Sequence, residues 1–252
     1  MNKKIFFLSG LPRTGSTLLT SILTENPNFY HEGNSALCQL MWDTKMSCET
    51  NSSEQLLASN KTYIKDKILK NLPELYYENV KSKYVIDKCR SWTLLENLKL
   101  IEDNITDTPK MIIMTRPITE IVKSFCYLDK INNRPNREKE LIQNGSEPIM
   151  RSLSGVITAV ESGSDNFLFI SYNDFVGNPK GTIDRVYEFL GIDRFDHNLE
   201  NILNRSPENE DAYELKHMHD IRSTVSKRNI DIRLSKEVFD ICQKIDKMYP
   251  YL

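Results

Sequence analysis

The sequence lacks the features that would divide it into parts or carry it across a membrane. No Pro-, Gly- or Ser-rich linker and no low-complexity stretch interrupts it, which predicts a single domain over residues 1–252. No apolar run approaches the length that spans a bilayer. The short apolar run at 5–8 leads directly into a glycine loop rather than a small-residue cleavage site, so we interpret it as a strand and not as a signal peptide.

Cysteine and net charge are also scarce. The five cysteines are scattered and lack paired metal-type spacing, which favours reduced thiols and a cytoplasmic location. A net charge of −2 gives no indication of nucleic-acid binding. With 39% apolar and 27% charged residues, the composition is that of an ordinary globular protein with ample material for a core.

Strand-like runs recur along the chain, with helix-like stretches between them. The central runs are continuously apolar, as in strands that helices bury on both faces. This alternation predicts an α/β fold of three layers, with a central, mostly parallel sheet flanked by helices. The expected strands are 4–9, 28–32, 83–88, 110–116 and 166–172, and the expected helices are 16–25, 35–47, 53–72, 93–103, 118–130, 147–162, 179–190 and 235–247.

The stretch "SGLPRTGSTLL" follows the first expected strand. Gly10 and Gly15 have the spacing of a P-loop, in which backbone N–H groups and a helix N-terminus hold an anion. An ATP-binding loop carries lysine directly after the second glycine, but here that position is Ser16. The cation of the loop is Arg13 instead, so the expected ligand differs from ATP.

Cations stand at the ends of two further strands. Ligands of an open parallel sheet gather beyond the carboxyl ends of its strands, where the sequence places Lys88 and Arg116. Together with Arg13 they replace both the P-loop lysine and a metal-holding acid. Such a site neutralises its anion with side chains, which predicts no metal ion and favours a nucleotide whose transferred group is less charged than a terminal phosphoryl group.

These residues carry a family resemblance. "GLPRTGSTLL" resembles the 5′-phosphosulfate loop of sulfotransferases that use 3′-phosphoadenosine 5′-phosphosulfate (PAPS), and "TRPITEIVKSF" resembles their 3′-phosphate motif. "ISYNDFVGNP" is similar to their Tyr-Glu-Asp-Leu segment, and "VIDKCRSW" to the strand end that supplies a catalytic lysine. The resemblance implies a P-loop-like fold and is nearest to the branch of tyrosylprotein and bacterial carbohydrate or small-molecule sulfotransferases.

The resemblance also implies a reaction and roles for residues. An acceptor hydroxyl or amine attacks the sulfur in line, and 3′-phosphoadenosine 5′-phosphate (PAP) leaves. Glu32 is the implied general base, while Lys88 and Arg13 stabilise the charge on the leaving group. The basic segment 219–228 takes the place of an Arg-Lys-Gly segment that the chain lacks. The implied cofactor-binding residues are Arg13, Thr14, Gly15, Ser16, Thr17, Leu18, Arg116, Ser124, Tyr172, Ser226 and Lys227.

Several alternatives stay open at this point. His31 is the second candidate for the base, and the segment 219–228 could equally be a solvated basic turn. A P-loop kinase would use Asp87 for Mg²⁺, and a catalytically silent module would only hold a nucleotide or a partner. His217 and His219 lack a placed third metal ligand. The acceptor can be a protein, a carbohydrate or a small molecule.

Overall fold

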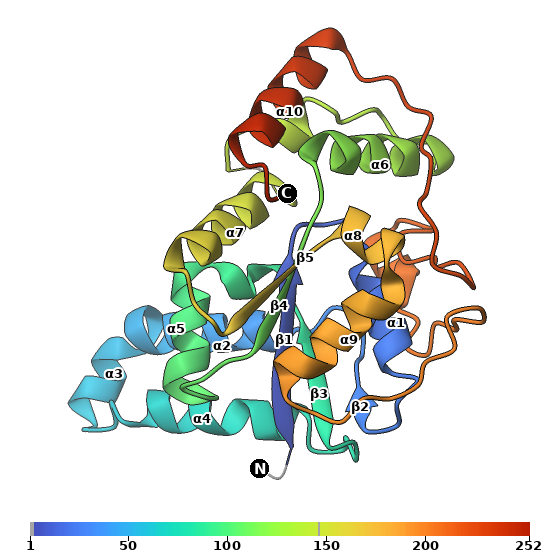
Figure 1. Cartoon of the computed structure of the whole chain (residues 1–252). Helices are drawn as coiled ribbons and strands as arrows, with labels where there is room; N and C mark the ends of the chain where they lie inside the picture. The colour runs from blue at the N-terminus through green and yellow to red at the C-terminus, as the bar shows by residue number, and fades with distance from the viewer. Residues whose placement is uncertain (1–2, 146) are drawn as a thin grey trace.

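A sheet of five parallel strands runs through the centre of the protein, with helices on both of its faces (Figure 1). The computed structural model describes residues 3–145 and 147–252. The strand order is β2-β3-β1-β4-β5, which places β1 and its following loop at the centre. The strands are β1 (Lys4–Gly10), β2 (Phe29–Tyr30), β3 (Tyr84–Lys88), β4 (Met111–Thr115) and β5 (Phe167–Ser171). The predicted α/β architecture with a parallel sheet is confirmed.

Each face of the sheet has its own apolar core. Alternate side chains of a strand point to opposite faces, so Phe6 packs into one core while Phe7 packs into the other. The core around Phe6 is covered by α1 (Ser16–Leu23), α8 (Tyr172–Gly177) and α9 (Pro179–Leu190). The core around Phe7 is covered by α2 (Leu37–Met46), α4 (Ile64–Tyr76), α5 (Leu95–Asn104), α6 (Ile118–Ile131), α7 (Met150–Ser162) and α10 (Lys236–Met248). Burial on both faces explains why the strands read as continuous apolar runs.

Several boundaries differ from those the sequence predicts, and two of the differences have a clear local cause. The helix expected over 53–72 is wrong, because the chain forms α3 (Ser53–Ala58) and α4, with a break where Asn60 takes a φ of 56°. Asparagine tolerates this left-handed conformation, which a helix cannot continue through. The last expected strand ends one residue early, since the Ser171 hydroxyl accepts a hydrogen bond from the Asp174 N–H at 3.1 Å and starts α8.

The last helix supports the start of α6 (Figure 1). The Asp246 carboxylate on α10 accepts hydrogen bonds from the backbone N–H of Ile118 at 2.6 Å and of Thr119 at 3.2 Å. The Thr119 hydroxyl also donates to it at 2.6 Å, and the Thr115 hydroxyl donates to the Tyr251 carbonyl at 3.0 Å. The junction between β4 and α6 is therefore held by the C-terminal part of the chain.

Over the residues described, no helix combines the length and apolarity needed to cross a membrane.

Candidate active site

A cleft opens beyond the carboxyl ends of β1, β3 and β4, and the segment 218–228 covers it. It encloses about 1120 Å³ of space, its open mouth included. Most of the residues that the sequence predicts for the site line this cleft, although they come from distant parts of the chain. They are Arg13, Gly15, Ser16, Thr17, Leu18, Lys88, Arg116, Ser124, Tyr172 and Ser226.

The loop after β1 turns directly into α1. Gly15 takes a φ of 83° immediately before Ser16, the first helical residue. Among the described residues no side chain caps this helix, so the N–H groups of its first turn are available to an anion in the cleft. Thr14 is buried, does not line the cleft, and donates its hydroxyl to the Leu11 carbonyl at 3.0 Å. Thr14 therefore shapes the loop through its side chain.

Three arginines meet at one end of the cleft. The Arg13 Nε donates to the Ser124 hydroxyl at 3.0 Å, and Arg116 donates from Nη1 to the Arg13 carbonyl at 2.8 Å. The Arg116 guanidinium lies 4.0 Å from the centre of the Tyr172 ring, and the backbone N–H of Arg228 donates to the Tyr172 hydroxyl at 3.2 Å. Sequence reasoning linked Arg116 with Ser124 but placed Arg13 at the 5′-phosphosulfate end. In the structure the Arg13 side chain contacts Ser124.

This cluster holds three positive charges close together, with acidic side chains around it. Burial, together with the charges of Arg228 and Arg116, lowers the pKa of Arg13 to about 10 against the opposing charges of Glu210 and Asp220. Arg116 has an acidic partner, with 3.0 Å between its Nε and Glu120 Oε2. Like charges held this close favour an anionic ligand, since an anion between them offsets their repulsion.

Lys88 lies at the other end of the cleft, beside the first turn of α1. Its side chain is buried, and its Nζ donates to the Thr17 hydroxyl at 3.4 Å. Burial lowers the pKa of Lys88 to about 8; the charge of Glu208 raises it and that of Arg90 lowers it. The ammonium is therefore protonated at neutral pH and gives up its proton more readily than an exposed lysine.

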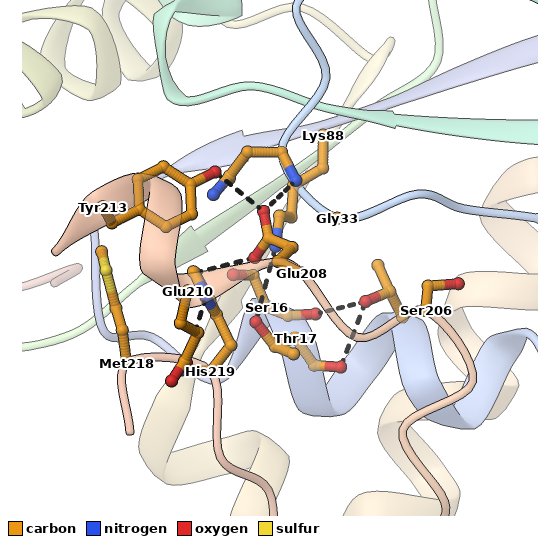
Figure 2. Close-up of polar contacts among 12 residues, drawn as sticks. Ser16, Thr17, Gly33, Lys88, Ser206, Glu208, Glu210, Tyr213, Met218 and His219 are labelled. Atoms are coloured by element: carbon orange, nitrogen blue, oxygen red, sulfur yellow. Dashed lines mark hydrogen bonds and ion pairs between the residues drawn. The ribbon is translucent and has the colours of Figure 1, made fainter. Parts of the chain in front are cut away.

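Glu208 lies on the segment between α9 and α10, and its carboxylate is close to Lys88. Figure 2 shows its carboxylate between Lys88, Tyr213 and His219. Glu208 Oε1 accepts from the Asn34 N–H at 2.6 Å and from the Tyr213 hydroxyl at 3.3 Å, and Oε2 lies 2.9 Å from His219 Nε2. Burial opposes the charged form, but His219, Lys88 and the Asn34 N–H outweigh it and lower the pKa of Glu208 to about 2. Glu208 is thus a fixed counter-charge.

The two candidate bases follow β2 and do not line the cleft. His31 Nε2 lies 2.9 Å from the Thr20 hydroxyl, and its Nδ1 accepts from the Gly33 N–H at 3.2 Å. Burial, aided by the charge of Lys88, lowers the pKa of His31 to about 3, so this ring is neutral. Glu32 Oε2 accepts from the Tyr30 hydroxyl at 3.2 Å, and its Oε1 has no hydrogen-bond partner within the described residues.

Asp87 faces away from the cleft, into the core on the other side of β3. Its carboxylate accepts hydrogen bonds from the Trp92 Nε1 at 2.6 Å, the Tyr77 hydroxyl at 2.7 Å and the Ser35 hydroxyl at 2.9 Å. Burial raises its pKa to about 6 against these hydrogen bonds. The carboxylate that a kinase would offer to Mg²⁺ is therefore engaged elsewhere. Residues 3–145 and 147–252 contain no group of three or more His, Cys, Asp or Glu placed to hold a metal ion.

The charge pattern of the segment that covers the cleft predicts only part of its contacts. Lys227 donates to Asn173 Oδ1 at 2.9 Å and lies outside the cleft lining, whereas its neighbour Arg228 lines it. Charge pattern alone does not separate two adjacent cations on an irregular segment. Glu208 was missed altogether, because it lies in a stretch without hydrophobic periodicity and next to no strand end.

Comparison with known proteins places the fold. A model described as "Sulfotransferase family" matches residues 6–197. No curated protein matches the chain. The sulfotransferase domain from the curacin biosynthetic pathway is 16% identical, with a TM-score of 0.56 over 100% of this chain and 99% of that domain. The sulfotransferase domain from the Synechococcus PCC 7002 olefin synthase is 18% identical, with a TM-score of 0.55 over 96% and 94%.

A third solved structure was determined with a nucleotide. Retinol dehydratase in complex with androsterone and the inactive cofactor PAP is 17% identical, with a TM-score of 0.56 over 97% of this chain and 80% of that one. At this level of identity the likeness establishes the shared P-loop-like fold.

Proposed function

Because the chain belongs to the sulfotransferase family, we propose that it transfers the sulfuryl group of PAPS to a hydroxyl or amine of an acceptor by in-line displacement, without a metal ion. The observation that carries the proposal is the cleft with two cationic ends. Arg13, Arg116 and Arg228 gather with Ser124 at one end, while buried Lys88 stands beside the lysine-free loop at the other. A nucleotide with phosphate on both the 3′ and 5′ positions matches this distribution.

The 5′ end of the donor would meet the first turn of α1. The family resemblance implies that backbone N–H groups there, together with the hydroxyls of Ser16 and Thr17, bind the 5′-phosphate. In this protein these groups line the cleft. Arg116 and Ser124 hold the 3′-phosphate, with Arg13 and Arg228 adding charge. PAPS, when bound, supplies the activated sulfuryl group. The protein supplies position and fixed positive charge.

Lys88 is the proposed stabiliser of the leaving group. Charge builds on the oxygen that joins phosphate to sulfur, and a buried ammonium already in place needs no reorganisation to stabilise it. The base is proposed to be Glu32, because its Oε1 has no hydrogen-bond partner among the described residues. His31 is the alternative, although both of its ring nitrogens already take part in hydrogen bonds. An acceptor that reaches Glu32 would approach from the β2 side of Lys88.

Nucleotide selectivity tests the proposed donor. We expect the protein to bind PAP about 10- to 100-fold more tightly than adenosine 5′-phosphate, as a charge-assisted hydrogen-bond pair to one phosphate contributes on that order. In Arg116→Ala this preference should largely disappear, and Ser124→Ala should reduce it in part. Isothermal calorimetry with PAP, adenosine 5′-phosphate and ATP with Mg²⁺ measures all three. Equal affinity for PAP and adenosine 5′-phosphate, or selective binding of Mg²⁺-ATP, would contradict the proposal.

The rate of PAP release from PAPS is expected to fall above about pH 8. Only protonated Lys88 can stabilise the leaving group, and burial lowers the pKa of Lys88 from 10.5 to about 8. The ammonium is therefore present below pH 8 and lost as the pH rises, whereas an exposed lysine would keep its proton beyond pH 10. Rates measured at saturating PAPS over a series of pH values show this fall. In Lys88→Arg the fall should be absent. A rate that stays constant to pH 9.5 argues against the role.

A further inference from the structure

Arg90 is a further cation that lines the cleft. It begins the 3₁₀ turn after β3 (Arg90–Thr93), two residues beyond Lys88, and lines the cleft. Its backbone is fixed, because the Ser9 hydroxyl donates to its carbonyl at 2.9 Å. Over the described part of the chain, its guanidinium forms neither a hydrogen bond nor an ion pair. The structure thus holds a free guanidinium at a defined place.

The charge of Arg90 acts on the transfer end of the cleft. It opposes protonation of Lys88, adding to the effect of burial on the pKa of that lysine. It also favours ionisation of Tyr213, although burial dominates there and raises the pKa. Glu208 is the acid that balances Lys88; its Oε1 accepts from Asn34 and Tyr213, and its Oε2 lies 2.9 Å from His219 Nε2. Lys88 and Arg90 carry two positive charges, and Glu208 supplies one negative charge. A net positive charge therefore remains, which an anionic ligand would offset.

The donor does not require this charge. Its 3′-phosphate has the three arginines at the opposite end, and its 5′ end has the first turn of α1 together with Lys88. Arg90 is therefore left for the other reactant. Asn34 lines the cleft and Tyr213 is partly exposed nearby, so an amide and an aromatic ring accompany the guanidinium.

On the basis of the proposed function, we propose that Arg90 binds an oxyanion group of the acceptor, so that the preferred acceptors are hydroxyl compounds that carry a carboxylate or a sulfate. A guanidinium binds such groups through two parallel N–H···O bonds, which fixes orientation as well as charge. The anion would also offset the repulsion between Arg90 and Lys88. Acceptor binding would then keep the lysine protonated during transfer.

Matched acceptor pairs test this in the protein loaded with PAP. The pairs are 4-hydroxyphenylacetate with its amide, 6-hydroxyhexanoate with its amide, and glucuronate with glucuronamide, each titrated by calorimetry. In at least one pair the carboxylate should bind about tenfold or more tightly than the amide, the order expected for a charge-assisted pair. Arg90→Gln should bring the two members within about threefold and leave PAP affinity unchanged. Arg194→Gln, an exposed arginine paired with Asp184 outside the cleft, should keep the preference.

Each remaining result overturns the inference. Equal affinity within every pair, or no measurable binding of any carboxylate, shows that the cleft does not select an anionic acceptor. If Arg90→Gln weakens binding of PAPS but not of PAP, the guanidinium holds the sulfuryl group of the donor instead. Failure of the unaltered protein to bind PAP would overturn the proposed function itself, and the two failures are thereby distinguished.

Discussion

Replacing Lys88 with alanine is expected to lower the turnover of PAPS by about two to four powers of ten, the range seen when a buried charge-stabilising group is removed. Lys88 is buried, close to Thr17, and in the cationic cleft where the leaving group would form. The affinity for PAP should change only a few-fold, because the three arginines and Ser124 at the other end of the cleft remain. Release of PAP from PAPS and calorimetry with PAP measure the two quantities separately.

Two variants control this experiment. Lys61→Ala removes one exposed lysine from the surface between α3 and α4 and should leave turnover unchanged. Lys88→Arg keeps the charge but changes its geometry, so part of the activity should return. If Lys88→Ala keeps turnover within a few-fold of the unaltered protein, the leaving group is stabilised by another residue.

A methyl group on Gly10 is expected to destabilise the whole protein. Gly10 is the last residue of β1, with a φ of 116°, and a Cβ atom there would lie 2.2 Å from the Met114 carbonyl oxygen of β4. Backbone strain and overpacking together cost about 2 to 6 kcal/mol. In a domain of this size, Gly10→Ala should therefore lower Tm by roughly 4 to 24 °C, or prevent folding. Thermal unfolding followed by circular dichroism measures the effect.

Gly177 provides the matched control for that substitution. It lies at the end of α8, and a Cβ atom added there meets no other atom within 4 Å. Gly177→Ala should leave Tm within about 2 °C of the unaltered protein, as is usual for surface changes. Similar values of Tm for the two variants would show that β1 can move away from β4.

The order of strands and helices could be predicted because burial of the sheet on both faces leaves a strong pattern. The central residues of the runs at 4–9 and 110–116, which are 5–8 and 111–114, are apolar throughout, as a covered central strand requires. The prediction of a single helix over 53–72 was wrong for the opposite reason. Its residues are mostly exposed, so tertiary packing does not decide their conformation, and Asn60 breaks the helix locally.

The site was predictable as far as strand ends define it. Lys88 and Arg116 follow strands whose carboxyl ends meet at one edge, so their meeting follows from topology. The direction of the Arg13 side chain does not follow from topology. This side chain donates to the carbonyl of Met218, which lies on a segment with no regular structure. Glu208, which accepts a hydrogen bond from the Asn34 N–H, also lies on a segment with no regular structure. Contacts made by such segments leave no periodic signal.

The support that α10 gives to the start of α6 couples two parts of the chain that lie far apart in the sequence. Arg116 and Pro117 stand between Thr115, whose hydroxyl donates to the Tyr251 carbonyl, and the backbone N–H of Ile118, which donates to Asp246. Local opening of α10 would therefore loosen the backbone that carries Arg116 and leave the loop after β1 in place.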